Sequence, residues 1–182
     1  MITVPKIPLP AALDRLDSAF DMRLEPLRRS TLLNRVFYTA SEVGDFGMVW
    51  LAIAAAQGAM GPDSKTKAAI RLALALGAES VLVNGIVKSF FKRERPAWEQ
   101  DRPMHLRKPR TSSFPSGHAS SAVTAVLLLT QPGTPWAPVY WAIAAVVALS
   151  RVHVKIHHVS DVAGGLIVGA IFGTAIRTLW PL

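Results

Sequence analysis

Long apolar stretches constrain this chain more than any other feature, because five of them reach or approach the length that crosses a bilayer. A membrane-spanning helix needs roughly 20 mostly apolar residues at about 1.5 Å of rise per residue. The third stretch, residues 115–130, is short, and we count it as a span only because its polar first turn would line a cavity and avoid lipid. The five stretches cover approximately residues 43–60, 68–91, 115–130, 136–152 and 159–180. The sequence therefore predicts an all-α fold, a polytopic transmembrane helical bundle of about five spans.

The residues before the first apolar stretch have a different pattern. Apolar side chains recur there at helical spacing, with charged residues between them: Leu13, Leu16, Phe20, Leu24 and Leu27. This pattern predicts an amphipathic helix that either lies in the membrane interface or packs on the polar end of the bundle. We therefore divide the chain into an N-terminal amphipathic interfacial arm, residues 1–42, and a transmembrane domain, residues 43–182.

Few residues are charged, and most of the charged residues are basic. Charged side chains make up 18% of the chain, against roughly 25% in an ordinary soluble domain, and the net charge is +8. This balance suits phosphate groups or anionic lipid headgroups. Nucleic acid is a poor fit, because no basic face with interleaved aromatic residues lies outside the apolar stretches. The chain has no cysteine, which excludes a thiolate nucleophile and cysteine metal ligands.

Three polar clusters fall at the same end of the predicted helices. The second apolar stretch ends with Lys88 and Arg95, seven residues apart, and Pro96 follows. Seven residues are close to two helical turns, so both cations would lie on one face. The proline would stop the helix and fix where the arginine points.

The second cluster opens the third apolar stretch with Pro115-Ser116-Gly117-His118. A proline in the first turn favours a helix start, and the free N–H groups of the next three residues would form a cradle for an anion. Gly117 lets the backbone approach such an anion closely. His118 would lie beside it, and imidazole exchanges protons near neutral pH.

The third cluster joins the last two apolar stretches and contains Arg151, His157 and Asp161. On a helix, residues four apart are neighbours, so the carboxylate takes a hydrogen bond from one ring nitrogen and leaves the other free as a nucleophile. Ionisable residues are costly in a bilayer, and a cluster of them between apolar spans indicates a functional site. The cluster predicts an anion site with its own nucleophile at the membrane edge.

Together, the three clusters resemble the three-part signature of the type 2 phosphatidic acid phosphatase (PAP2) superfamily. The matching strings are Lys88-x6-Arg95-Pro96, Pro115-Ser116-Gly117-His118 and Ser150-Arg151-x5-His157-x3-Asp161. The resemblance implies an integral membrane phosphatase that hydrolyses a lipid phosphate monoester or diphosphate through a phosphohistidine, without a metal ion or other cofactor. His157 would be the nucleophile, Asp161 its orienting partner and His118 the general acid. The phosphate would be held by Lys88, Arg95, Ser116, Gly117 and Arg151.

The resemblance leaves the substrate, the sidedness and the oligomeric state open. An isoprenoid diphosphate, a phosphatidic acid and a phosphatidylglycerol phosphate all fit a multi-pass protein of the cell membrane that meets its substrate among membrane lipids. Basic residues in the arm favour a cytoplasmic site by the positive-inside rule, whereas bacterial family members favour an outward-facing one. Two other functions stay open: a non-enzymatic lipid-headgroup-binding membrane protein, and a vanadium haloperoxidase-like enzyme with a similar oxyanion cradle.

Several further polar residues have no role in this signature. Glu79 and Asn84 lie within the second stretch and must face the bundle interior or a polar cavity. His153 has the spacing of a helical metal ligand, but Lys155 beside it disfavours a cation, and His158 has no assigned role. The cations between the second and third stretches are expected to be solvated or to contact headgroups: Lys92, Arg93, Arg102, Arg107, Lys108 and Arg110.

Three glycines at a spacing of four in the last stretch have a structural interpretation. Gly165, Gly169 and Gly173 leave one face of the predicted helix without side chains. Such a face allows another helix to approach closely, so we expect these glycines to pack and not to take part in chemistry.

Overall fold

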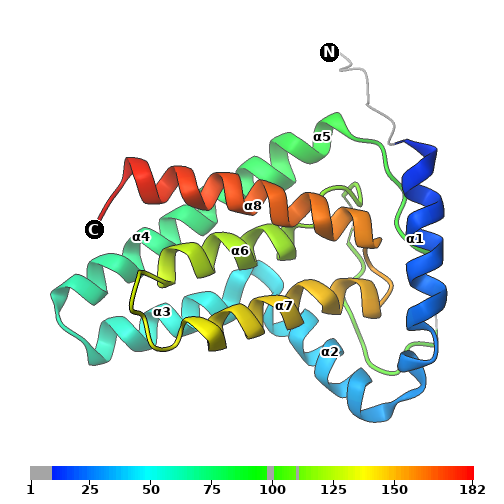
Figure 1. Ribbon diagram of the computed structural model, residues 1–182, viewed down its shortest axis with the longest axis horizontal. Helices are drawn as coiled ribbons and strands as arrows, with labels where there is room; N and C mark the ends of the chain where they lie inside the picture. Colours follow the sequence, from blue (N-terminus) through cyan, green and yellow to red (C-terminus); the bar gives the residue numbers. More distant parts are fainter. Residues whose placement is uncertain (1–9, 98–100, 110) are drawn as a thin grey trace.

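The computed structural model describes residues 10–97, 101–109 and 111–182, and no β-strand is found among them. The helices that run side by side along the bundle in Figure 1 are α3 (Met48–Met60), α4 (Asp63–Ser80), α6 (Gly117–Leu129), α7 (Ala137–His153) and α8 (Val159–Leu179). Helix α4 continues through a π-helical segment, η3 (Val81–Val87), into a last short turn, α5 (Lys88–Phe90). Each predicted apolar stretch thus corresponds to one helix of the bundle, and the all-α fold is confirmed.

Two of these helices are long and apolar enough to cross a membrane: the continuous helix Asp63–Phe90, of 28 residues, and α8, of 21 residues. A third span is possible if α2 (Thr31–Val43) and the helix Asp45–Met60 count as one, although they are bent by 64° at their junction. Helices α6 and α7 are apolar but have only 13 and 17 residues. The expected number of about five spans therefore includes one bent pair and two short helices.

Helix α6 lies at the centre of the bundle and is its most buried element. Its side chains Ala122, Ala125 and Val126 are fully buried and pack with Trp50 of α3 and Leu72 of α4. Small side chains on α6 let neighbouring helices approach closely, and the van der Waals packing that results is a main favourable term in the association of membrane helices.

The glycine face of α8 packs against α6 as predicted. A Cβ atom added to Gly165 would overlap the carbonyl oxygen of Ser116, and one added to Gly169 would overlap that of Ser120. The Thr124 hydroxyl also donates to the Gly169 carbonyl oxygen at 3.2 Å. These contacts bring the first turn of α6 next to the start of α8, where two of the polar clusters lie.

Helix α1 (Ala11–Leu24) crosses one end of the bundle (Figure 1). Asp17 on this helix is buried and accepts hydrogen bonds from the backbone N–H and the hydroxyl of Ser160, at 2.9 and 2.7 Å. Leu16, Phe20 and Met22 remain exposed on the same helix. The helix therefore packs on the polar end of the bundle and still presents apolar side chains outward, so the two placements expected for it are compatible. Residues 1–9 of the predicted arm lie outside the described residues.

Candidate active site

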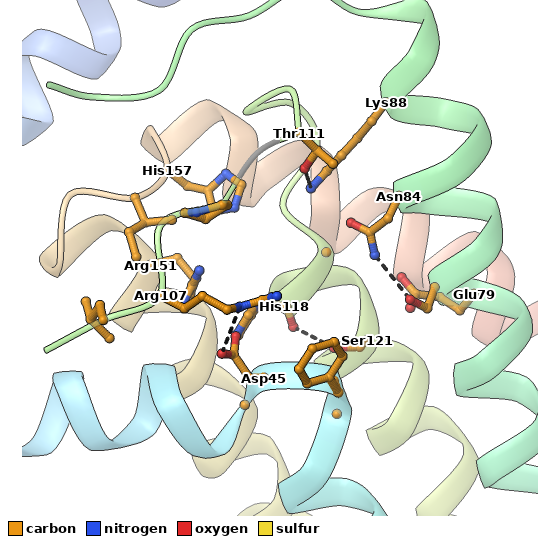
Figure 2. Close-up of a pocket in the computed structure, with 18 of the residues that line it drawn as sticks. Asp45, Glu79, Asn84, Lys88, Arg107, Thr111, His118, Ser121, Arg151 and His157 are labelled. Atoms are coloured by element: carbon orange, nitrogen blue, oxygen red, sulfur yellow. Dashed lines mark hydrogen bonds and ion pairs between the residues drawn. The ribbon is translucent and has the colours of Figure 1, made fainter. Parts of the chain in front are cut away.

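A cavity of about 580 Å³ opens at the end of the bundle where the polar clusters meet (Figure 2). Six of the eight residues predicted for the site line it: Lys88, Arg95, Gly117, His118, Arg151 and His157. The other two, Ser116 and Asp161, are fully buried and do not line it. Glu79 and Asn84 also line the cavity, as expected for polar residues within the second apolar stretch.

His157 and Asp161 form a buried pair. His157 lies in the loop between α7 and α8, just before the helix, with its Nδ1 atom 3.5 Å from Asp161 Oδ2. Asp161 is fully buried, and its Oδ2 also accepts from the Ser113 hydroxyl at 2.5 Å and from the His158 N–H at 2.8 Å. The carboxylate is thus held from three sides, which fixes the orientation of the imidazole ring.

The other ring nitrogen of His157 faces a cation. Its Nε2 lies 3.2 Å from Nη1 of Arg95. Burial lowers the pKa of His157 well below its usual value, and the charges of Arg95, Arg151 and Lys88 lower it further, while the hydrogen bond with Asp161 opposes them. The neutral ring that results keeps a lone pair, which a nucleophile requires.

Arg95 reaches the site from a loop and not from a helix, so the prediction that it shares a helical face with Lys88 is wrong. The helix ends at Phe90, and the following residues are extended. The guanidinium is then oriented by three backbone carbonyl oxygens, those of Thr111 at 3.2 Å, Ser112 at 3.1 Å and Ile156 at 2.9 Å. Burial lowers the pKa of Arg95 to about 10, against the opposing effect of Asp161, so the side chain stays charged at neutral pH.

Two further cations lie on the walls of the cavity. Lys88 is 6% exposed, and its Nζ lies 3.4 Å from the Thr111 hydroxyl. Arg151, 4% exposed, donates to the hydroxyl of Ser41 on α2 and lies 3.5 Å from the carbonyl oxygen of the same residue. Buried cations of this kind need an anionic partner, and an anion bound in the cavity would supply one.

The first turn of α6 differs in part from the predicted anion cradle. The Ser116 N–H already donates to the Asp161 carbonyl oxygen at 2.9 Å, and the Ser116 hydroxyl caps the helix by accepting from the Ala119 N–H at 3.5 Å. Ser116 therefore lacks the free N–H expected of it, because α8 packs against it. Gly117 and His118 line the cavity, and their N–H groups belong to the first turn, which has no intrahelical acceptors.

His118 contacts α2 and the segment that follows it. Its Nε2 lies 3.1 Å from Oδ1 of Asp45 and 3.1 Å from the Ser41 carbonyl oxygen. Neither partner was predicted, since both lie more than 70 residues away in the sequence. Figure 2 shows His118 and Asp45 facing each other on one side of the cavity, with His157 on another.

Arg93 was predicted to be a solvated or headgroup-contacting cation, and this prediction is wrong. Its side chain is 8% exposed, with Nη1 2.6 Å from Asp161 Oδ1, and Nη2 forms an ion pair with Asp17. Burial alone would lower the pKa of Arg93, but Asp161 and Asp17 outweigh it and raise that pKa. Arg93 thus joins the N-terminal arm to the carboxylate that orients His157.

The remaining loop cations have varied surroundings. Arg107 and Lys108 line the cavity, and Arg102 donates to the Val154 carbonyl oxygen at 2.5 Å. Arg110 lies outside the described residues.

The two histidines without an assigned role have structural contacts. His153 is buried, packs on the Phe37 ring, and its Nε2 lies 2.8 Å from Oδ1 of Asn34. His158 is the N-cap residue of α8. No group of three or more His, Cys, Asp or Glu side chains suited to a metal ion was found in the described ranges.

Fold and site together define a class, an all-helical membrane protein with a cationic site around a carboxylate-paired histidine at one end of its bundle. The family model of the PAP2 superfamily matches residues 68–181, and the chain belongs to this superfamily.

Curated relatives are named as lipid phosphatases. The chain is 34% identical over 128 residues to a decaprenylphosphoryl-5-phosphoribose phosphatase of Mycolicibacterium smegmatis, which covers 69% of this chain and 67% of the relative. It is 29% identical over 121 residues to a putative undecaprenyl-diphosphatase of Escherichia coli, YbjG, covering 66% of this chain and 61% of that protein.

Two solved structures share the fold. A transmembrane PAP2-type phosphatidylglycerolphosphate phosphatase from Bacillus subtilis superposes with a TM-score of 0.72, at 24% identity, over 93% of this chain and 87% of that one. LpxE from Aquifex aeolicus superposes with a TM-score of 0.65, at 26% identity, over 82% of this chain and 88% of that one. The resemblance inferred from the three sequence motifs is therefore confirmed at the level of family and fold.

Proposed function

We propose that this protein is an integral membrane phosphatase that hydrolyses a lipid phosphate monoester or diphosphate through a phosphohistidine on His157. The observation that carries this proposal is the buried His157–Asp161 pair beside a cavity that Lys88, Arg95 and Arg151 also line. Phosphoryl transfer requires an oriented nucleophile and positive charge around the phosphoryl oxygens, and this arrangement supplies both.

In the first half of the reaction, Nε2 of His157 attacks phosphorus and the bond from phosphorus to the leaving oxygen breaks. Arg95, Lys88 and Arg151 stabilise the charge on the phosphoryl oxygens. Asp161 stabilises the positive charge that develops on the ring, and His118 protonates the leaving oxygen. The lipid alcohol or lipid phosphate then leaves with that proton.

In the second half, a water molecule attacks phosphorus and the N–P bond breaks. His118, now neutral, accepts the proton of the water, which returns it to its starting state. Inorganic phosphate leaves, and His157 regains its lone pair. The scheme balances without a redox partner or a metal ion, and we propose that the enzyme is metal-independent.

The relatives favour a polyprenyl lipid as the first substrate to test. One is named for a decaprenylphosphoryl sugar phosphate and another for undecaprenyl diphosphate. Phosphatidic acid and phosphatidylglycerol phosphate should be assayed beside it. A site at the end of the bundle selects a lipid by where its phosphate lies, and not by the chemistry of its tail. A ranking of kcat/KM over these lipids and soluble esters identifies the class.

We expect His157→Ala to abolish phosphate release from lipid phosphates in detergent micelles, because the proposed phosphohistidine forms on this residue. The matched control is His105→Ala, since His105 is an exposed loop histidine and its removal should leave the rate unchanged. Wild-type activity should also survive EDTA. Full activity of His157→Ala would contradict the nucleophile, and loss of activity on chelation would contradict metal independence.

A further inference from the structure

The segment Gly44-Asp45-Phe46-Gly47 bends the chain sharply beside His118. Phe46 and Gly47 have φ values of 56° and 71°, and the helices on either side are bent by 64°. A Cβ atom on Gly44 would lie 2.9 Å from Cδ2 of His118, so the backbone approaches the ring as closely as a residue without a side chain allows. The bend turns the Asp45 carboxylate into the cavity.

Asp45 contacts one particular nitrogen of His118. Its Oδ1 lies 3.1 Å from Nε2, and the Ser41 carbonyl oxygen lies 3.1 Å from the same atom. A carboxylate and a carbonyl oxygen both accept, so Nε2 carries a proton. Nδ1 has no hydrogen bond within the described residues, and the ring lines the cavity. Nδ1 is therefore the nitrogen available to exchange a proton with substrate.

The charges around His118 show why a carboxylate matters there. Arg151 faces the ring from α7, and Arg107 lies on the other side of Asp45, with Nε 3.9 Å from Oδ2. Lys88 and Arg95 line the same cavity. A proton on both nitrogens of His118 adds one more positive charge to this cationic site, which is unfavourable without a nearby anion. Of the two carboxylates that line the cavity, Asp45 contacts His118, whereas no contact of Glu79 with either histidine is found in the described part of the chain.

We propose that Asp45 is a positioning residue that holds His118 as the proton donor, so that the site contains two histidine–carboxylate pairs with separate tasks. Nδ1 of His118 gives its proton to the leaving oxygen as the bond from phosphorus to that oxygen breaks, and later takes a proton from the attacking water. Asp45 stays ionised throughout and stabilises the imidazolium. This inference rests on the proposed phosphatase function.

The test compares two phosphate esters that differ in their need for a proton. Dioctanoyl phosphatidic acid releases an alkoxide-like oxygen that must be protonated, whereas p-nitrophenyl phosphate releases a stable phenolate that need not be. We expect Asp45→Asn to lower kcat/KM about 10- to 100-fold for the lipid and less than about threefold for the aryl ester, with little change in KM.

Glu42→Gln is the matched control, because Glu42 is an exposed carboxylate one turn earlier in the chain, on α2. This variant should leave kcat/KM unchanged for both esters. Gly44→Ala gives a second variant that keeps the carboxylate but displaces the His118 ring, and it should show the same selective loss for the lipid. Equal losses for both esters, a change confined to KM, or no loss would each overturn the role of Asp45. Full activity of His157→Ala would instead overturn the phosphatase mechanism itself, so the two failures are distinguishable.

Discussion

His157 is 3% exposed and is surrounded by cations, and both conditions favour its neutral form. Burial lowers the pKa of the ring first, Arg95 and Arg151 lower it further, and the Asp161 hydrogen bond opposes this without reversing it. At the residue scale, the design of the site is therefore asymmetric. In the proposed mechanism, His157 keeps a lone pair for attack, whereas His118, beside Asp45, holds a proton for the leaving oxygen.

The lowered pKa of His157 predicts where activity is lost in acid. The neutral ring persists below the usual pKa of about 6.5, so kcat/KM, corrected for the separately measured ionisation of the substrate, should not decline as the pH falls through that value. Activity should fall only at lower pH, where His157 gains a proton. A profile of kcat/KM between pH 4 and 9 tests this. A decline of the corrected kcat/KM that is centred at or above pH 6.5 would contradict the lowered pKa of His157.

The sequence identifies the site residues that belong to short motifs, but not those that reach the site from afar. His157, Asp161, His118 and the motif cations Lys88, Arg95 and Arg151 could be predicted because they belong to the three short motifs. Arg93 could not be predicted, since its place beside the site depends on its ion pair with Asp17, which lies 76 residues away in the sequence. Asp45 likewise belongs to no motif, and only the bend at positive φ brings its carboxylate to His118.

At the scale of elements, α1 is connected directly to the His157–Asp161 pair. Asp17 accepts from the backbone and side chain of Ser160, and Arg93 bridges Asp17 and Asp161. A buried ion-pair network contributes little by itself, but removal of one member leaves the others uncompensated. The arm is thus expected to support the orientation of Asp161.

Asp17→Ala should therefore lower kcat about tenfold or more, because Arg93 loses a buried partner and its contact with Asp161 becomes less constrained. Asp14→Ala provides the control, since Asp14 meets the same arginine at 3.4 Å but its side chain is 71% exposed, and exposed pairs contribute little. Steady-state assays of the two variants compare their kcat values with that of the wild type. Equal activity of Asp17→Ala and Asp14→Ala would mean that α1 has no role in positioning the site.

Apolar runs predicted the bundle helices well, but they missed how α2 and α3 are joined. The first stretch was expected from residue 43, whereas α3 begins at Met48 and α2, Thr31–Val43, occupies the end of the predicted arm. Hydropathy records composition along a helix, and it does not record the bend that Phe46 and Gly47 introduce. The glycine spacing of α8, in contrast, predicted helix packing correctly, because small residues act through the shape of one face.

At the scale of the whole molecule, the bundle separates a lipid-facing surface from a polar end. Large apolar side chains are exposed on the outer faces of the long helices: Ile70, Leu74, Val81, Ile86, Leu149, Ile167 and Ile171. Exposed apolar area of this extent is typical of a surface that meets lipid. The cationic cavity lies at the end of the same bundle, so a lipid substrate could keep its tail in the bilayer while its phosphate reaches His157.

Trapping of the phosphorylated enzyme tests the central claim, that His157 carries the phosphoryl group, most directly. Rapid mixing of the enzyme with a lipid phosphate labelled with ³²P, followed by a quench in base, should give a labelled protein whose label is stable in base and lost in acid, as a phosphohistidine requires. We expect mass spectrometry to locate the label on His157 and expect no labelling of His157→Ala. Turnover of the substrate with no labelled protein at any reaction time, or a label at another residue, would contradict the account.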